Sequence, residues 1–236
     1  MVWLTRGLAF VLAGLFGGVA CVALSQLSPV AALLGRHLLG LPLAGALLWF
    51  GSACLRRVTT PGRAWCAATR RCLWSAICVF FFSPFAYLLH HAPSVDYLAF
   101  NFVFFNLASA VFVCSVNRLV FRLAEFHDDR LMALLARGSE WFCYATLLVA
   151  VGACSVATWF VATDEGMEMV GALDMLMEGF WPWLLALCLL PVCVTAAMLW
   201  SMKAVTLARL GALAGAAKKP QPAPMESQSL SGSERR

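Results

Sequence analysis

Six long stretches of the chain are almost entirely apolar, and the polar residues gather between them. Each stretch contains 18 to 22 residues. An α-helix rises about 1.5 Å per residue, so roughly 20 residues cross the hydrocarbon core of a bilayer. None of the stretches alternates with the period of two that is typical of a barrel strand. The pattern predicts six transmembrane helices, at residues 7–27, 38–55, 72–89, 97–117, 141–162 and 180–200.

These helices are expected to form one transmembrane domain, residues 1–217, because no separate polar domain interrupts them. The last helix should continue beyond residue 200 into the cytoplasm. Residues 218–236 are rich in proline and serine and have almost nothing to bury, which predicts a disordered cytoplasmic tail. The first run can also be interpreted as a cleaved signal peptide. Its 21 residues exceed the usual apolar core of about 7–15, so we expect it to be retained.

Composition agrees with a lipid environment. The chain is 62% hydrophobic and only 12% charged, whereas soluble domains carry about 25% charged residues. A water-exposed surface with so few ionic groups would contain large apolar patches. The sequence therefore predicts an all-α, polytopic integral membrane helix bundle whose main partner is the lipid bilayer.

The distribution of positive charge predicts how the helices are threaded. If the N-terminus is cytoplasmic, the cytoplasmic segments hold 16 of the 17 lysines and arginines, and only Arg36 lies outside. Lys and Arg in short loops stay on the cytoplasmic side. We therefore expect both termini in the cytoplasm and a location in the cell (cytoplasmic or inner) membrane. The loop LRRVTTPGRAWCAATRR, residues 55–71, has five arginines and no acid.

These loop arginines are flanked by hydrocarbon, whereas a nucleic-acid binder gathers its basic residues on a solvated face. Nucleic acid is therefore excluded as a partner, and contact with anionic lipid headgroups is a secondary role for the loop. Tryptophan and tyrosine should lie at the headgroup level, because amphipathic rings favour the membrane interface. The aromatic residues near span ends are Trp3, Trp65, Trp74, Tyr97, Trp141, Trp159, Trp181, Trp183 and Trp200.

Motifs that would identify a reaction are missing from the sequence. It contains no phosphate-binding loop, no H-E-x-x-H zinc helix and no G-x-S-x-G nucleophile turn. No Asp, Glu, Lys or Arg lies in the central part of a span, where coupled carriers commonly bind their ion. The ten cysteines form no C-x-x-C pair and are interpreted as small apolar residues. We predict no catalytic residues and no cofactor.

Metal binding is likewise not predicted. An outer copper site is the sharpest alternative, because thioether and imidazole groups suit copper. Its ligands would be His90 and His91 with the methionines before the sixth span, but two of those methionines fall on the apolar face of an amphipathic segment. These methionines are Met167, Met169, Met175 and Met177.

A polar stripe runs along the fourth span, which has the most polar interior of the six. A rotation of about 100° per residue places Asn106, Ser109 and Asn117 on one side of this helix. Polar groups of this kind commonly hydrogen-bond to neighbouring transmembrane helices, and this is the interpretation we favour. The alternative is that the stripe lines a polar cavity or path.

Small residues share one face of the first span, at Gly7, Gly14, Gly18 and Ser25. Gly14 and Gly18 form a G-x-x-x-G pattern, which allows two helix backbones to approach closely. The face predicts helix packing, either within the chain or with a partner.

Two prolines, Pro84 and Pro191, lie inside the third and sixth spans and predict kinks. Each removes a backbone N–H and leaves the carbonyl four residues earlier without its helical donor, at Phe80 and Leu187. Broken helices form substrate sites in some transporters, but ordinary kinks are commoner. Between spans four and five, Asp128 is expected to cap a short helix that ends before Gly138.

The sequence gives no positive signal for one biochemical activity. The absence of catalytic motifs, the small-residue face and the short loops favour a non-enzymatic accessory or assembly component that acts through helix packing with other membrane proteins or a second copy. A small-solute permease or channel with a polar path near Asn106 is the alternative, and a lipid-modifying membrane enzyme comes third. These three functions require different structures. A permease requires a polar cavity near Asn106, and an accessory component requires a filled interior. An enzyme requires a pocket at the headgroup level in which ionisable groups converge.

Overall fold

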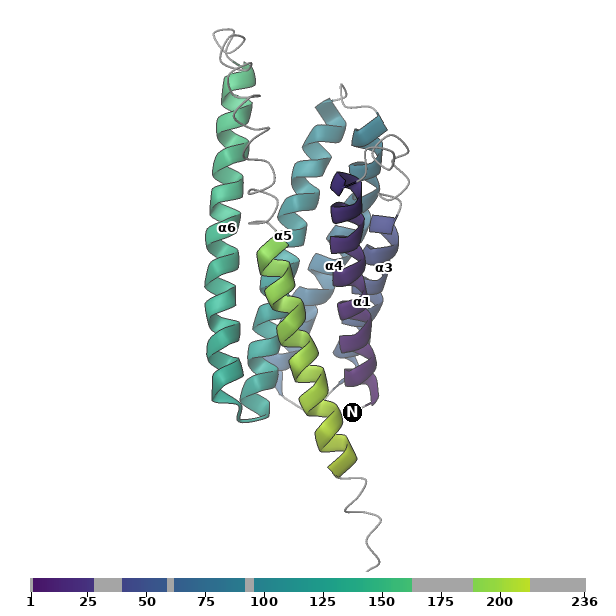
Figure 1. Ribbon diagram of the computed structural model, residues 1–236, viewed down its shortest axis with the longest axis vertical. Helices are drawn as coiled ribbons and strands as arrows, with labels where there is room; N and C mark the ends of the chain where they lie inside the picture. Colours follow the sequence, from purple (N-terminus) through teal and green to yellow (C-terminus); the bar gives the residue numbers. More distant parts are fainter. Residues whose placement is uncertain (1, 28–39, 59–61, 92–95, 163–188, 213–236) are drawn as a thin grey trace, which may run out of the picture.

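Every secondary-structure element in the described part of the chain is an α-helix (Figure 1). The computed structural model describes residues 2–27, 40–58, 62–91, 96–162 and 189–212. The helices are α1 (Val2–Leu27), α3 (Gly40–Arg56), α4 (Arg63–His91), α5 (Asp96–Phe126) and α6 (Arg130–Ala162), with a C-terminal helix at Leu189–Ala212. The predicted all-α class is confirmed for these residues.

Four of these helices are long and apolar enough to cross a membrane, namely Val2–Ala23, Arg63–Leu89, Phe100–Phe126 and Leu189–Ala212. Helix α3 is a shorter apolar helix. This architecture fits a helical membrane protein. The predicted tail at 218–236, the amphipathic segment before the sixth span and the first part of that span lie outside the described residues.

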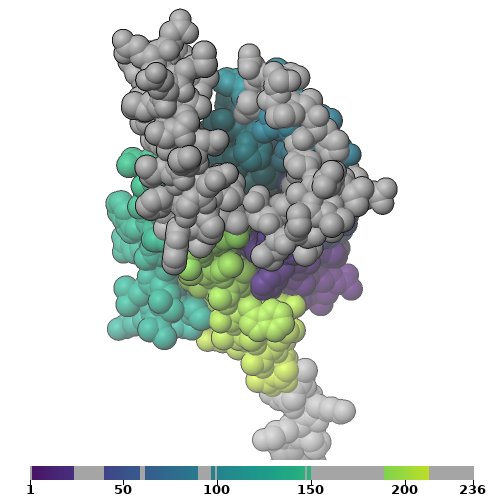
Figure 2. Space-filling view, turned by 45° about the horizontal axis from the view of Figure 1, so that its top comes forward, coloured from purple at the N-terminus to yellow at the C-terminus, as the bar shows by residue number. Residues whose placement is uncertain are grey.

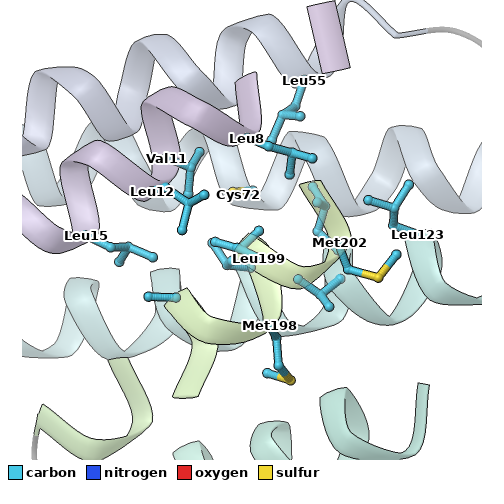
Figure 3. Packing of buried hydrophobic residues seen from close by; sticks show 14 of the residues in the cluster. Leu8, Val11, Leu12, Leu15, Leu55, Cys72, Leu123, Met198, Leu199 and Met202 are labelled. Carbon is cyan, nitrogen blue, oxygen red and sulfur yellow. The ribbon is translucent and has the colours of Figure 1, made fainter. Parts of the chain in front are cut away.

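Neighbours in sequence pack against each other: α1 on α3, α3 on α4, α4 on α5 and α5 on α6. The C-terminal helix lies between α1 and the α5–α6 hairpin, as the space-filling view shows (Figure 2). Its Leu199 and Met202 are fully buried beside Leu8 of α1 and Leu123 of α5 (Figure 3). Side chains from all six described helices thus share one apolar core.

The described basic residues all lie toward one end of the bundle, which we call the basic end. At this end Arg57, just after α3, lies 4.9 Å from the ring of Trp3 in α1. Arg209 of the C-terminal helix donates a 2.7 Å hydrogen bond to the carbonyl of His127 after α5. The N-terminus and the α5–α6 turn also lie there (Figure 1). The residues are Arg6, Arg56, Arg57, Arg63, Arg70, Arg71, Arg118, Arg122, Arg130, Arg137, Lys203 and Arg209.

The turn between α5 and α6 corrects the expectation for Asp128. Asp128 has a φ of 55° and follows α5 in the left-handed conformation that ends many helices. The cap of the next helix is Asp129, whose Oδ1 accepts a 3.1 Å hydrogen bond from the amide of Met132. Helix α6 then continues through Gly138 rather than ending before it. One left-handed residue followed directly by an N-cap produces a tight antiparallel hairpin.

Trp65 departs from the predicted aromatic belt. Helix α4 begins at Arg63, so the second half of the arginine-rich segment is helical rather than a loop. Trp65 is only 1% exposed and belongs to the core, whereas Trp74 and Trp141 are 62% and 72% exposed. Trp65 therefore faces the interior of the bundle, whereas a ring of the aromatic belt would face the lipid headgroups. Its large ring instead anchors the start of α4 to the bundle.

Candidate functional site

Glycines form a close contact between α1 and α3. A Cβ atom at Gly51 would lie 2.8 Å from the backbone nitrogen of Val11 and 3.0 Å from the carbonyl oxygen of Gly7. A Cβ atom at Gly14 would lie 2.9 Å from the carbonyl oxygen of Ala44. Such distances leave no space for a side chain, so the two backbones approach as closely as a small-residue contact allows.

Gly18, a third glycine of the predicted small-residue face, takes no part in this contact. A Cβ atom at Gly18 would meet nothing within 4 Å, and the side chain of Ser25 lies outside the described residues. Within α1 the packing positions are therefore Gly7 and Gly14, seven residues apart. The G-x-x-x-G pattern of Gly14 and Gly18 is split between a buried and an open position.

Pro84 lies inside α4, and the structure satisfies the carbonyl that this proline leaves without a donor. The hydroxyl of Ser83 donates a 2.8 Å hydrogen bond to the carbonyl oxygen of Phe80. Gly45 of α3 covers the same turn, because a Cβ atom there would lie 2.9 Å from the Cα of Phe80. This turn of α4 thus packs against a neighbouring helix.

Pro191 lies near the start of the described C-terminal helix, and Leu187 lies outside the described residues. The carbonyl oxygen of Pro191 accepts a 2.7 Å hydrogen bond from the hydroxyl of Thr195. Thr195 is fully buried. Pro191 thus accepts a hydrogen bond from the same hydroxyl that takes part in the polar contact between the C-terminal helix and α5.

This polar contact is centred on Asn117 of α5, which is fully buried. Its Oδ1 accepts a 2.8 Å hydrogen bond from the hydroxyl of Thr195, and its Nδ2 donates to the sulfur of Cys143 in α6 at 3.3 Å. Ser109 donates to a carbonyl of its own helix. Asn106 is exposed, and the described residues give its amide no hydrogen-bond partner. Three helices therefore meet at Asn117 and not at Asn106.

Replacing Asn117 with leucine is expected to destabilise the protein by about 0.6–1.7 kcal/mol, the range of interhelical hydrogen bonds in membranes. Leucine has the same branched arrangement of side-chain heavy atoms but cannot form hydrogen bonds to Thr195 or Cys143. The matched control is Asn106→Leu, which removes no bond of the described chain and should change stability by less than about 0.5 kcal/mol. Thermal unfolding in one detergent measures both. An equal loss of thermal stability in the two variants would contradict the assignment of the interhelical contact to Asn117.

A groove opens between α5 and α6 near the basic end. It consists of two adjoining cavities of about 190 Å³ and 520 Å³, which share Arg118, Glu140 and Tyr144. Arg118 lies 3.8 Å from Glu140, and the hydroxyl of Tyr144 donates to the same carboxylate at 3.4 Å. The remaining charged residues of the lining are Arg71, Arg122, Glu125 and Arg137.

Sequence reasoning missed this groove, since it used Arg118, Arg122 and Arg137 only as topology signals. A usable signal was the spacing of Arg118 and Arg122 on α5 and of Arg137, Trp141 and Tyr144 on α6. In each case the residues recur every three or four positions and so share one helix face. The hairpin at Asp128 places these two faces beside each other.

His127 is a second buried polar group at the basic end, with 4% of its surface exposed. Its Nε2 lies 3.4 Å from the hydroxyl of Thr206, and its Nδ1 has no hydrogen-bond partner among the described residues. Burial lowers the pKa of His127, the nearby charge of Arg209 lowers it further, and Asp129 opposes the shift. The ring is therefore neutral at pH 7.

This lowered pKa predicts how stability depends on pH. The unfolded chain binds a proton near the ordinary pKa of 6.5, whereas folded His127 binds one only at lower pH. Stability should therefore fall as the pH drops below about 6.5. His127→Gln, which cannot titrate, should make the decline between pH 7 and 5 shallower. Thermal unfolding across this range measures both proteins, and identical pH profiles would contradict the prediction.

No metal site is apparent in the part of the chain that the structure describes. Its His, Cys, Asp and Glu residues form no group of three or more that could hold an ion. The methionines of the alternative copper site lie outside the described residues. Asn117 and its partners are neutral groups that join helices, whereas the groove beside Arg118 combines charged side chains with an open volume.

Comparison of the chain with protein-family models, with curated proteins and with solved structures returned no match.

Proposed function

We propose that the protein is a multi-pass component of the cell (cytoplasmic or inner) membrane that acts without catalysis, as an accessory or assembly subunit, through helix packing. The filled interior carries this proposal. The core draws buried side chains from all six described helices and includes bulky residues such as Phe112 and Leu199, each at most 1% exposed. A core packed in this way favours recognition at the outer faces of the bundle.

The same component is proposed to span the membrane six times with both termini in the cytoplasm. The basic end supports this threading, because the positive charges of separate helices gather there and such charges remain cytoplasmic. The fifth span would lie within α6, and the sixth would continue into the described C-terminal helix. Helix partners would then approach from the lipid side.

The proposal is tested by purification in a mild detergent. We expect a second membrane protein, or a second copy of the chain, to co-purify in a fixed ratio and to remain bound through size-exclusion chromatography. Gly18→Leu adds bulk at an open position of α1, so it tests whether the partner uses this face without disturbing the core. A monomeric chain with no fixed partner, whose liposomes conduct a small solute, would overturn the accessory role.

The permease remains the second candidate because Asn106 is exposed on a helix long enough to span the membrane. An exposed amide in hydrocarbon is costly, so it requires either a polar partner or water. In a background without native cysteines, Asn106→Cys is expected to resist a water-soluble thiol reagent if another helix covers it. Rapid labelling together with solute flux would make the permease the better proposal.

A further inference from the structure

The groove beside Arg118 carries more positive charge than its own carboxylates neutralise. Glu125 forms a 2.7 Å ion pair with Arg122, and Glu140 lies 3.8 Å from Arg118. Within the described residues, neither Arg71 nor Arg137 has a carboxylate partner. Four guanidinium groups therefore face two carboxylates, and two positive charges remain.

The rim of the groove has the character of a membrane interface. Trp141 is 72% exposed and Tyr144 is 46% exposed, and amphipathic rings favour the headgroup level. The two rings lie about three and four turns into α6 and line the groove together with Arg118 of the antiparallel helix. The guanidinium groups are thus placed where lipid phosphates lie.

The surface that continues the groove away from the basic end is apolar. On α5, Leu107 and Val111 occupy the same helix face as Arg118 and are 38% and 43% exposed. On α6, Leu148 follows Tyr144 after one turn and is 76% exposed. A water-soluble anion would gain nothing from this surface, but the acyl chains of a lipid would cover it.

We propose that this groove binds an anionic phospholipid. Its headgroup phosphate would lie among the four arginines of the lining, Arg71, Arg118, Arg122 and Arg137, and its acyl chains along Leu107, Val111 and Leu148. Arginine suits the phosphate because its planar guanidinium donates two parallel hydrogen bonds. Basic pockets between transmembrane helices on the cytoplasmic side are known to hold such headgroups. Glu140 lowers the affinity, since its carboxylate competes with the phosphate for Arg118.

The first test measures binding of phosphatidylglycerol to the purified full-length protein by native mass spectrometry. Phosphatidylcholine serves as the zwitterionic comparison. Arg71→Gln combined with Arg137→Gln should weaken phosphatidylglycerol binding about 25-fold, because each arginine near a lipid surface contributes about 1 kcal/mol, or a factor of about five. The control pair Arg63→Gln and Arg130→Gln removes the same charge outside the groove and should change binding less than about twofold.

A second variant tests the same site through a gain of affinity. Glu140→Gln removes the competing carboxylate and should tighten phosphatidylglycerol binding several-fold, a change that loss of folding cannot produce. Inorganic phosphate at millimolar concentration should neither displace the lipid nor raise the thermal stability. Any of four results would overturn the proposal. The groove double variant could bind phosphatidylglycerol as tightly as the unchanged protein, or the control pair could weaken this binding as much as the groove pair does. Phosphatidylcholine could bind as tightly as phosphatidylglycerol, or inorganic phosphate could displace the lipid.

Discussion

Replacing Trp65 with alanine is expected to lower the free energy of unfolding by about 3–5 kcal/mol, the range for deleting a fully buried aromatic side chain. Trp65 is 1% exposed and contacts the shared apolar core. Its removal leaves a large cavity at the start of α4, beside the arginines of the basic end. Chemical or thermal unfolding in a mild detergent measures the loss.

Two further variants separate burial from the chemistry of the indole ring. The indole Nε1 of Trp65 has no hydrogen-bond partner among the described residues, so Trp65→Phe forfeits volume but no bond and should cost much less than alanine. Trp74→Ala removes a ring that is 62% exposed and should change stability by less than about 0.5 kcal/mol. If Trp74→Ala were as damaging as Trp65→Ala, the inward position of Trp65 would be wrong.

Gly51→Ala should destabilise the protein by about 1–3 kcal/mol, because the added methyl group forces α1 and α3 apart. The new Cβ would lie 2.8 Å from the backbone nitrogen of Val11 and 3.0 Å from the carbonyl oxygen of Gly7. These atoms belong to the backbone, so no side-chain rotation relieves the contact. The thermal midpoint of the purified variant reports the effect.

The control for this substitution is Gly18→Ala, on the same pair of helices. Its methyl group would meet nothing within 4 Å, and alanine is the better helix former by about 0.5–1 kcal/mol. Gly18→Ala should therefore be neutral or slightly stabilising. A destabilisation equal to that of Gly51→Ala would contradict the account, because it would show that the loss does not depend on the close α1–α3 contact at Gly51.

The helices were predictable because their signal is local. Runs such as 97–117 are apolar over the length of a bilayer, and this requires no knowledge of their neighbours. Their ends were less predictable: α5 continues to Phe126 and α6 begins at Arg130, both well beyond the apolar runs. Polar helical turns outside the hydrocarbon carry no hydropathy signal.

For the candidate site, the sequence predicts only which residues share a face of one helix. Helical rotation relates the positions of Asn106 and Asn117 on α5, but only the packing of the C-terminal helix decides that Asn117 is buried against Thr195. The same limit applies to Gly14 and Gly18, because the partner residues Leu48 and Ala44 belong to another helix. Contacts between helices distant in sequence require the three-dimensional arrangement.

The central claim, that the chain threads the membrane six times with the basic end in the cytoplasm, is tested most directly by topology reporters. The lysines and arginines that the structure describes lie toward one end of the bundle, and the rule for positive charge predicts that this end is cytoplasmic. Fusions after residues 60, 130 and 215 should therefore report a cytoplasmic location, and fusions near residues 93 and 167 an exterior one. A cytoplasmic signal at residue 93 or 167 would contradict the six-span bundle.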